Sequence, residues 1–240
     1  MNARELFKAG KLNEAVQALG AEVRDNPSDA QRRTFLFELL CFAGDYERAD
    51  KHLELLGDGG QNTQLGALLY RGVLAADRTR QRMFEKRDFP STPVPDSAVR
   101  GTINGRPFTA LADADPRIGP RLEVFCAGSY MWIPFAHIAS ILVEPPKRLR
   151  DLLWIPARVL SGPSFQGMEL GEVIIPVISP LSWKHADDNV RLGRATVWED
   201  EPESGESVPL GQKILLVDDE EMPFLELRKL EFAGSTGEAS

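Results

Sequence analysis

The chain has 240 residues, 42% of them hydrophobic, and a formal net charge of −8. This size and apolar content allow one large domain or two small ones with a real core. An acidic chain is a poor binder of nucleic acid, because contacts to phosphate need clustered Lys and Arg.

The start of the chain is charged, and no stretch of 18 apolar residues without charges occurs. We therefore expect a cytoplasmic protein with no signal peptide and no membrane insertion. Cys41 and Cys126 stand in neither a disulfide framework nor a metal-ligand spacing, and Cys41 is expected to be a buried free thiol. No glycine-rich phosphate loop or nucleophile elbow is present, so we expect no cofactor.

A seven-residue run that begins at Ala9 returns 34 residues later, beginning at Ala43. This interval is the period of the tetratricopeptide (TPR) helical repeat. Gly10 and Gly44 stand where one helix of such a repeat ends, a position that favours glycine. The sequence therefore predicts TPR-like α-helical repeats over residues 1–88. Helices are expected over residues 5–9, 12–23, 28–42, 46–56 and 65–86, with Ser28 as the N-cap of the third.

Residues 89–98 contain three prolines and predict a linker. From residue 99 apolar residues recur at every second position, and Asn104-Gly105 is a strong hairpin signal. Strands are predicted over 99–103, 106–111, 121–125, 131–134, 138–143, 154–159, 173–177, 195–199, 213–217 and 224–232. An acidic loop is expected over 199–207 and a disordered tail over 234–240. The predicted fold class is α+β, with TPR-like helices followed by a mainly β domain, residues 99–233, that forms a small barrel or sandwich.

One short run could supply a catalytic base or metal ligands: His185, Asp187 and Asp188. A metal site needs three or four converging ligands, and the other histidines, His52 and His137, lie elsewhere in the sequence. We therefore expect no catalytic or metal-binding residues. A metal-dependent hydrolase stays only as an alternative.

Large aromatic and arginine side chains are spread through the second half. These residue types anchor many protein interfaces. We predict partner binding by Tyr130, Trp132, Arg150, Trp154, Arg158, Trp183, Arg194 and Trp198. The alternative is that most of these rings fill the core of the β domain.

Five segments of the second half carry a resemblance to a known family. They are Ser129–Phe135, Arg150–Ala157, Arg191–Trp198, Gly211–Lys213 and Leu225–Phe232. In this order they resemble the ImpE/TagJ (SciE-type) accessory proteins of bacterial type VI secretion systems. That family also begins with a TPR-like helical half, so the resemblance extends over nearly the whole chain.

The resemblance implies a non-catalytic cytoplasmic adaptor. Such an adaptor binds the small sheath subunit TssB, through an N-terminal helical segment of that subunit, and links it to the AAA+ ATPase ClpV in sheath turnover. The residues by themselves indicate only a helical binding module joined to a β domain, and they leave homo-oligomerisation open. A generic TPR-type peptide-binding co-chaperone or scaffold therefore stays as a second alternative.

Overall fold

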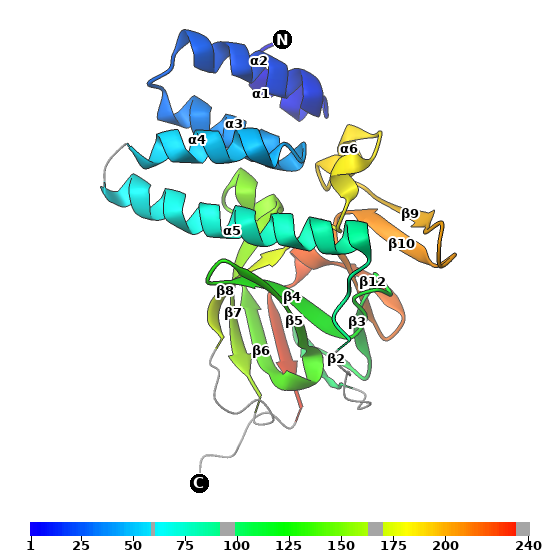
Figure 1. Cartoon of the computed structure of the whole chain (residues 1–240). Helices are drawn as coiled ribbons and strands as arrows, with labels where there is room; N and C mark the ends of the chain where they lie inside the picture. The colour runs from blue at the N-terminus through cyan, green and yellow to red at the C-terminus, as the bar shows by residue number, and fades with distance from the viewer. Residues whose placement is uncertain (59–60, 92–98, 163–169, 234–240) are drawn as a thin grey trace.

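A computed structural model describes residues 1–58, 61–91, 99–162 and 170–233 of the chain. Helices form the first part and a mainly β region the second, so the predicted α+β class is confirmed (Figure 1). Most of the predicted linker, residues 92–98, and the predicted tail, residues 234–240, lie outside the described residues. No helix in the described ranges has the length and apolar character that a membrane span requires.

Five helices precede the β region, and each packs chiefly against the next in the chain. They are α1 (Ala3–Lys8), α2 (Leu12–Asp25), α3 (Ala30–Phe42), α4 (Tyr46–Gly57) and α5 (Gln61–Lys86). All five predicted helices are present, but the N-cap of α3 is Asp29 and not Ser28. The carboxylate of Asp29 accepts the backbone N–H groups of Gln31 and Arg32, whereas Ser28 lies one position outside the cap.

The two turns at the repeated positions have the same backbone hydrogen bonds. In each, the glycine N–H donates to the carbonyl three residues earlier, and the next N–H donates to the carbonyl five residues earlier. Gly10 and Gly44 adopt φ angles of 75° and 73°, the left-handed conformation of a helix C-terminus that favours glycine. The alanines that end the two repeated runs, Ala15 and Ala49, are fully buried where helices meet.

We expect Gly44→Ala to lower the free energy of unfolding by about 2 kcal/mol or more. A Cβ at this position would require a left-handed alanine and would lie 2.5 Å from the ring of Trp183. Gly20→Ala is the matched control, because Gly20 lies inside α2 with open space around it. That change should stabilise the protein by about 0.5–1 kcal/mol. Urea unfolding of both variants measures this, and equal effects would contradict the packing of Trp183 on the turn.

The β region contains one large antiparallel sheet with the strand order β2-β1-β13-β6-β7-β8-β4-β5. These strands are β1 (Gly101–Ile103), β2 (Arg106–Phe108), β4 (Arg121–Cys126), β5 (Ser129–Pro134), β6 (Ile138–Val143), β7 (Trp154–Ser161), β8 (Gly171–Pro176) and β13 (Lys229–Phe232). The β1–β2 hairpin turns at Asn104 and Gly105, both with positive φ, as predicted. Because β2 and β5 are the ends of the strand order, the barrel or sandwich stays a prediction.

Two smaller sheets accompany the large one. β9 (Thr196–Asp200) pairs with β10 (Ser207–Gly211), and β11 (Ile214–Val217) lies between β3 (Leu111–Asp113) and β12 (Glu220–Pro223). Short 3-10 helices, η1 (Phe135–His137), η2 (Leu149–Leu152), η3 (Ser182–Lys184) and η4 (Phe224–Glu226), and one α-helical turn, α6 (Asp188–Arg191), connect the strands.

Sequence reasoning was wrong at four places in this region. The single strand expected over 106–111 is divided, because β3 leaves the large sheet to pair with β11. β10 and β12 were missed, since each is the short second arm of a hairpin with little alternation of its own. The strand expected over 224–232 begins only at Lys229, because residues 224–226 form η4.

Two hydrophobic clusters form the core. One lies within the β region. The other joins the helices to the β region, because it contains Leu36, Phe37 and Tyr70 together with Phe125 and Trp154. Helix α5 lies across β4 and β5, between the other helices and the sheet (Figure 1). The two predicted domains, residues 1–88 and 99–233, therefore share one hydrophobic cluster.

Candidate functional site

A buried cluster of charged side chains joins α5 to the strands. Arg80, Glu123, Lys213 and Asp113 are each at most 4% exposed, and we call these four residues the interface cluster. Nε and Nη2 of Arg80 donate to the two carboxylate oxygens of Glu123 at 2.7 and 3.0 Å. The ammonium group of Lys213 contacts the carboxylates of both Asp113 and Glu123.

Glu123 is the centre of this cluster. Burial acts to raise the pKa of Glu123, but attraction by Arg80 and Lys213 outweighs it and lowers the pKa to about 2. The hydroxyl of Tyr130 also donates to Glu123, at 2.5 Å, and Nε1 of Trp132 donates to the Tyr130 oxygen. A buried charge needs such partners to be tolerated. Tyr130 and Trp132, two of the predicted partner-binding residues, therefore belong to the hydrogen-bond network of the interface cluster.

Two further predicted residues hold α3 and α5 against the β region. Trp154 is 2% exposed, with its ring centroid 6.4 Å from that of Phe37 and 6.5 Å from that of Tyr70. The guanidinium carbon of Arg150 lies 4.7 Å from the Tyr70 ring centroid. Nε of Arg150 lies 3.2 Å from a carboxylate oxygen of Glu38. These contacts fill the face of α3 and α5 that is directed toward the β region.

The segment between β8 and β9 reaches the two turn glycines. Trp183 packs directly on Gly44. The guanidinium of Arg194 donates to the carbonyls of Phe7 and Lys8 at 2.7 and 3.2 Å, where α1 ends. Its guanidinium carbon lies 4.7 Å from the Phe7 ring centroid. Arginine at a helix C-terminus satisfies free carbonyl groups and interacts favourably with the helix dipole.

The eight predicted partner-binding residues thus do not form one surface. Six of them contact the helices or the interface cluster: Tyr130, Trp132, Arg150, Trp154, Trp183 and Arg194. Trp154 is a core residue, so the prediction that it contacts a partner at the surface is corrected here. Arg158 and Trp198 lie at the surface, with 63% of the Arg158 side chain and 40% of Trp198 exposed. Partner binding by the exposed members stays a prediction.

The run at His185 is also engaged in the fold. Nδ1 of His185 accepts the backbone N–H of Asp187 at 3.0 Å, and its Nε2 lies 3.3 Å from Oε1 of Glu199. The carboxylate of Asp187 caps α6. Asp188 accepts the backbone N–H of Leu12 at 2.7 Å and so caps α2, whose own N-cap residue provides no side-chain bond. The described residues contain no group of three His, Cys, Asp or Glu side chains that could hold a metal ion.

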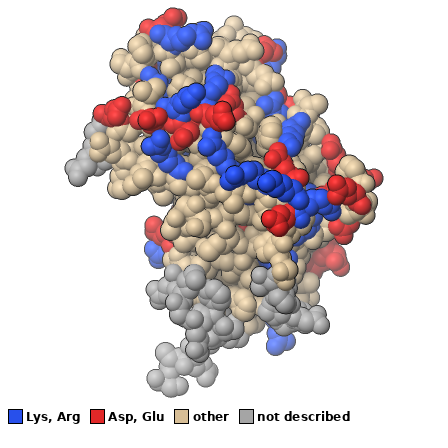
Figure 2. Space-filling view, viewed as in Figure 1, with Lys and Arg blue, Asp and Glu red and all other residues tan. Residues whose placement is uncertain are grey.

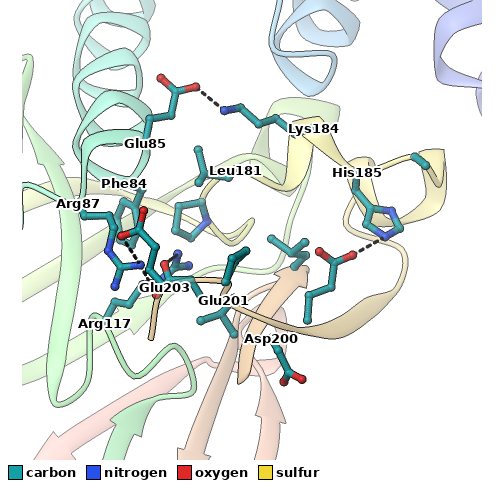
Figure 3. Close-up of a pocket in the computed structure, with 16 residues that line it drawn as sticks. Phe84, Glu85, Arg87, Arg117, Leu181, Lys184, His185, Asp200, Glu201 and Glu203 are labelled. Atoms are coloured by element: carbon teal, nitrogen blue, oxygen red, sulfur yellow. Dashed lines mark hydrogen bonds and ion pairs between the residues drawn. The ribbon is translucent and has the colours of Figure 1, made fainter. Parts of the chain in front are cut away.

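A groove of about 570 Å³ lies beside this run, between the end of α5, residues 180–186 and the β9–β10 hairpin (Figure 3). We call it the hairpin groove. Ion pairs cross its rim, with Lys184 2.7 Å from Glu85 and Arg87 2.8 Å from Glu201. The first pair joins η3 to α5, and the second joins the β9–β10 hairpin to the residue that follows α5.

Unpaired basic side chains lie along the second half of α5. Figure 2 shows Lys and Arg in a run over this helix. Arg78, Arg82 and Lys86 belong to α5 and make no ion pair with any described residue, whereas Arg71 of the same helix pairs with Asp50 at 3.2 Å. This face is available to acidic groups.

Glu38 is buried at the contact between α3 and η2. Burial raises the pKa of Glu38 to about 7, although Arg150 opposes the shift. Between about pH 4.5 and pH 7, Glu38 is therefore protonated in the folded state and ionised in the unfolded state, where its pKa has the usual value of 4.5. The contribution of Glu38 to stability should fall as the pH rises from about 4.5 through 7.

We expect Glu38→Gln to remove this loss. The free energy of unfolding of the variant, measured relative to that of the parent chain, should therefore rise by about 2 kcal/mol between pH 5 and pH 8. Urea unfolding at several pH values measures the difference. Glu54→Gln, at an exposed position of α4, is the control. If the pH profile of Glu38→Gln runs parallel to that of the parent, Glu38 is ionised throughout and the account of its burial is wrong.

A model of the ImpE protein family matches residues 105–231. The type VI secretion system accessory component TagJ of Pseudomonas aeruginosa is 33% identical over 97% of this chain and 91% of its own length. The chain belongs to the ImpE family. This membership confirms the resemblance seen in the sequence.

A crystal structure of similar fold covers both the helices and the β region. Protein VPA1032 from Vibrio parahaemolyticus superposes with a TM-score of 0.83 over 96% of this chain and 97% of that chain, at 22% sequence identity. The likeness concerns the fold alone. The ImpE match lies in the β region and includes Glu123 and Lys213, whereas their partner Arg80 lies in α5.

Sequence reasoning missed the interface cluster in this ImpE-family chain. Glu123 stands between Leu122 and Val124, and Lys213 directly precedes an apolar strand. An isolated charge in an apolar run is the available signal, because such a charge must find a partner if the strand is buried. The signal does not identify the partner, since Arg80 lies 43 residues before Glu123.

Proposed function

We propose that the chain is a non-catalytic cytoplasmic adaptor of a type VI secretion system. In this proposal it binds the small sheath subunit TssB, through the N-terminal helical segment of that subunit, and links it to the ClpV ATPase in sheath turnover. The observation that carries the proposal is the 33% identity, over 97% of the chain, to a protein named as an accessory component of that system.

The shape of the molecule supports a role in docking. Residues 1–88 would form a TPR-like array, residues 99–233 the mainly β part and residues 89–98 the linker between them. Stacked helices provide extended surfaces for other proteins. The unpaired basic face of α5 and the exposed Arg158 and Trp198 add side chains suited to protein contacts.

The chemistry of the best catalytic candidate supports a non-catalytic role. His185 accepts a backbone N–H through Nδ1, and the carboxylates of Asp187 and Asp188 cap two helices. Groups held in this way serve the fold. A metal-dependent hydrolase that uses them would have to release both caps.

Isothermal titration calorimetry of the purified chain with the small sheath subunit tests the proposal. We expect binding to the complete subunit and loss of binding when its N-terminal segment is removed. A second titration, with ClpV, tests the link to the ATPase. Absence of heat with the complete sheath subunit, at concentrations where both proteins are folded and soluble, would contradict the proposal.

A TPR-type peptide-binding co-chaperone or scaffold is the second candidate. It requires a free groove along the helices for a peptide tail. Trp154 and Arg150 of the same chain occupy the face of α3 and α5 where Phe37 and Tyr70 lie. This internal occupancy closes that part of the helical surface to a peptide, and the 33% identity to a type VI secretion system accessory component favours the adaptor.

A further inference from the structure

Part of the helical surface, at α1 and α3, is not covered by the β region. A groove of about 540 Å³ lies between α1, α3 and η2. Its apolar walls are provided by Phe7, Phe35 and Leu149, with Thr34 beside them, and the rings of Phe7 and Phe35 meet edge to face at 5.8 Å. We call it the α1–α3 groove.

This groove continues the internal contact between the helices and the β region. Leu149 of η2 lines it, and the next residue, Arg150, contacts Glu38 and Tyr70. The Glu38–Arg150 contact therefore links the groove to the segment of the β region that packs on the helices, since Trp154 of the same segment packs on Phe37, on another side of α3.

The polar groups of the α1–α3 groove lack complete partners. Glu38 lines it and is 6% exposed, yet no side-chain or backbone N–H of the described residues forms a hydrogen bond with its carboxylate. The contact with Arg150 is at 3.2 Å, but the Arg150 Nε–H makes no hydrogen bond. The buried polar atom left without a hydrogen-bond partner at this contact is Nε of Arg150. Glu38 itself lines the groove, where its carboxyl oxygens can accept a hydrogen bond from an occupant.

The rim of the groove carries unpaired positive charge. Arg4 and Lys8 of α1 are exposed and line the groove, and neither lies within ion-pair distance of an acidic side chain in the described part of the chain. Opposite charges on an occupant would be attracted to this rim. A positively charged occupant would be repelled.

We propose that the α1–α3 groove is a docking site for an acidic segment of a partner protein that inserts one Trp or Tyr side chain. The ring packs between Phe7, Phe35 and Leu149, and its N–H or O–H donates to Glu38. Aspartate or glutamate residues beside the ring face Arg4 and Lys8. Trp and Tyr suit such a place because they combine a large apolar ring with one polar group.

Three synthetic helical peptides of about 16 residues test the docking site with the full-length chain. The first carries a central Trp flanked by Glu, the second has Lys in place of Glu, and the third has Ala in place of Trp. Calorimetry or fluorescence anisotropy should give at least tenfold tighter binding for the first than for the other two. Equal binding of the Glu and Lys peptides, or no binding of the first, would overturn the proposal.

Variants of the chain then locate the site. Arg4→Glu with Lys8→Glu should weaken binding of the acidic Trp peptide at least tenfold. Thr34→Glu, on the groove wall, should do the same if the double variant does not fold. Arg78→Glu with Arg82→Glu makes the same charge change on the basic face of α5 and should leave binding unchanged. Loss of binding in this control, with retention in the groove variants, would place the peptide on α5 and refute the site.

Discussion

Glu123→Gln should lower the free energy of unfolding by about 3–5 kcal/mol, because it removes the buried carboxylate that binds the guanidinium of Arg80 through both oxygens. Glu123 accepts two hydrogen bonds from Arg80 and one from Tyr130, and it contacts Lys213. An uncharged amide of the same shape can keep some of these contacts but carries no charge to offset that of Arg80, whereas Lys213 keeps its contact with Asp113. Urea unfolding at pH 7 measures the loss.

The effect should depend on pH with a defined sign. Because the pKa of Glu123 in the folded state is lowered from 4.5 to about 2, its stabilisation is fully present above about pH 4.5 and is lost as the pH falls toward 2. The difference between the parent and Glu123→Gln should shrink over that range. Glu172→Gln is the matched control, since Glu172 lies on β8 with its side chain 87% exposed. A small effect of Glu123→Gln, similar to that of the control, would contradict the role of the interface cluster.

Trp154→Ala should lower the free energy of unfolding by about 3–5 kcal/mol. The ring is 2% exposed and belongs to the hydrophobic cluster shared by the helices and the β region. Its loss removes contacts with Phe37 and Tyr70 at the same time. Urea unfolding followed by circular dichroism measures the change, and separate transitions of the two halves are a further expected sign of a weakened contact.

Trp198→Ala is the control for this prediction. Trp198 lies on β9 and is 40% exposed, so the same substitution there should cost less than about 1 kcal/mol. If Trp198→Ala destabilises the chain as much as Trp154→Ala, the assignment of Trp154 to the shared core is wrong.

Trp154 and Trp198 show why the sequence could identify notable residues but could not predict whether each one is buried or exposed. Both follow the pattern of an aromatic residue in a short strand, and both lie in segments that resemble the ImpE family. Whether such a ring is buried depends on what covers its strand. Trp154 is covered by α3 and α5, which are distant in the sequence, and periodicity carries no information on that contact.

Local signals predicted the local structure well. The repeated glycines predicted the two helix turns, and Asn104-Gly105 predicted the β1–β2 hairpin, because each requires a backbone conformation that few residues adopt. Contacts over long range were not predictable in this way. The N-cap of α2 is supplied by Asp188, 176 residues after Leu12, and a carboxylate in a loop has no pattern that identifies the helix it caps.

In the proposed function, this ImpE-family chain is a docking platform whose aromatic and arginine side chains mainly build the internal contact, with partners bound on the outer helical surface. Hydrogen–deuterium exchange of the chain with and without the small sheath subunit tests it most directly. We expect added protection in α1 and α3, which line the α1–α3 groove, and no change at His185. Protection confined to residues 180–188 and the β9–β10 hairpin, or no protection at any helix, would contradict the account.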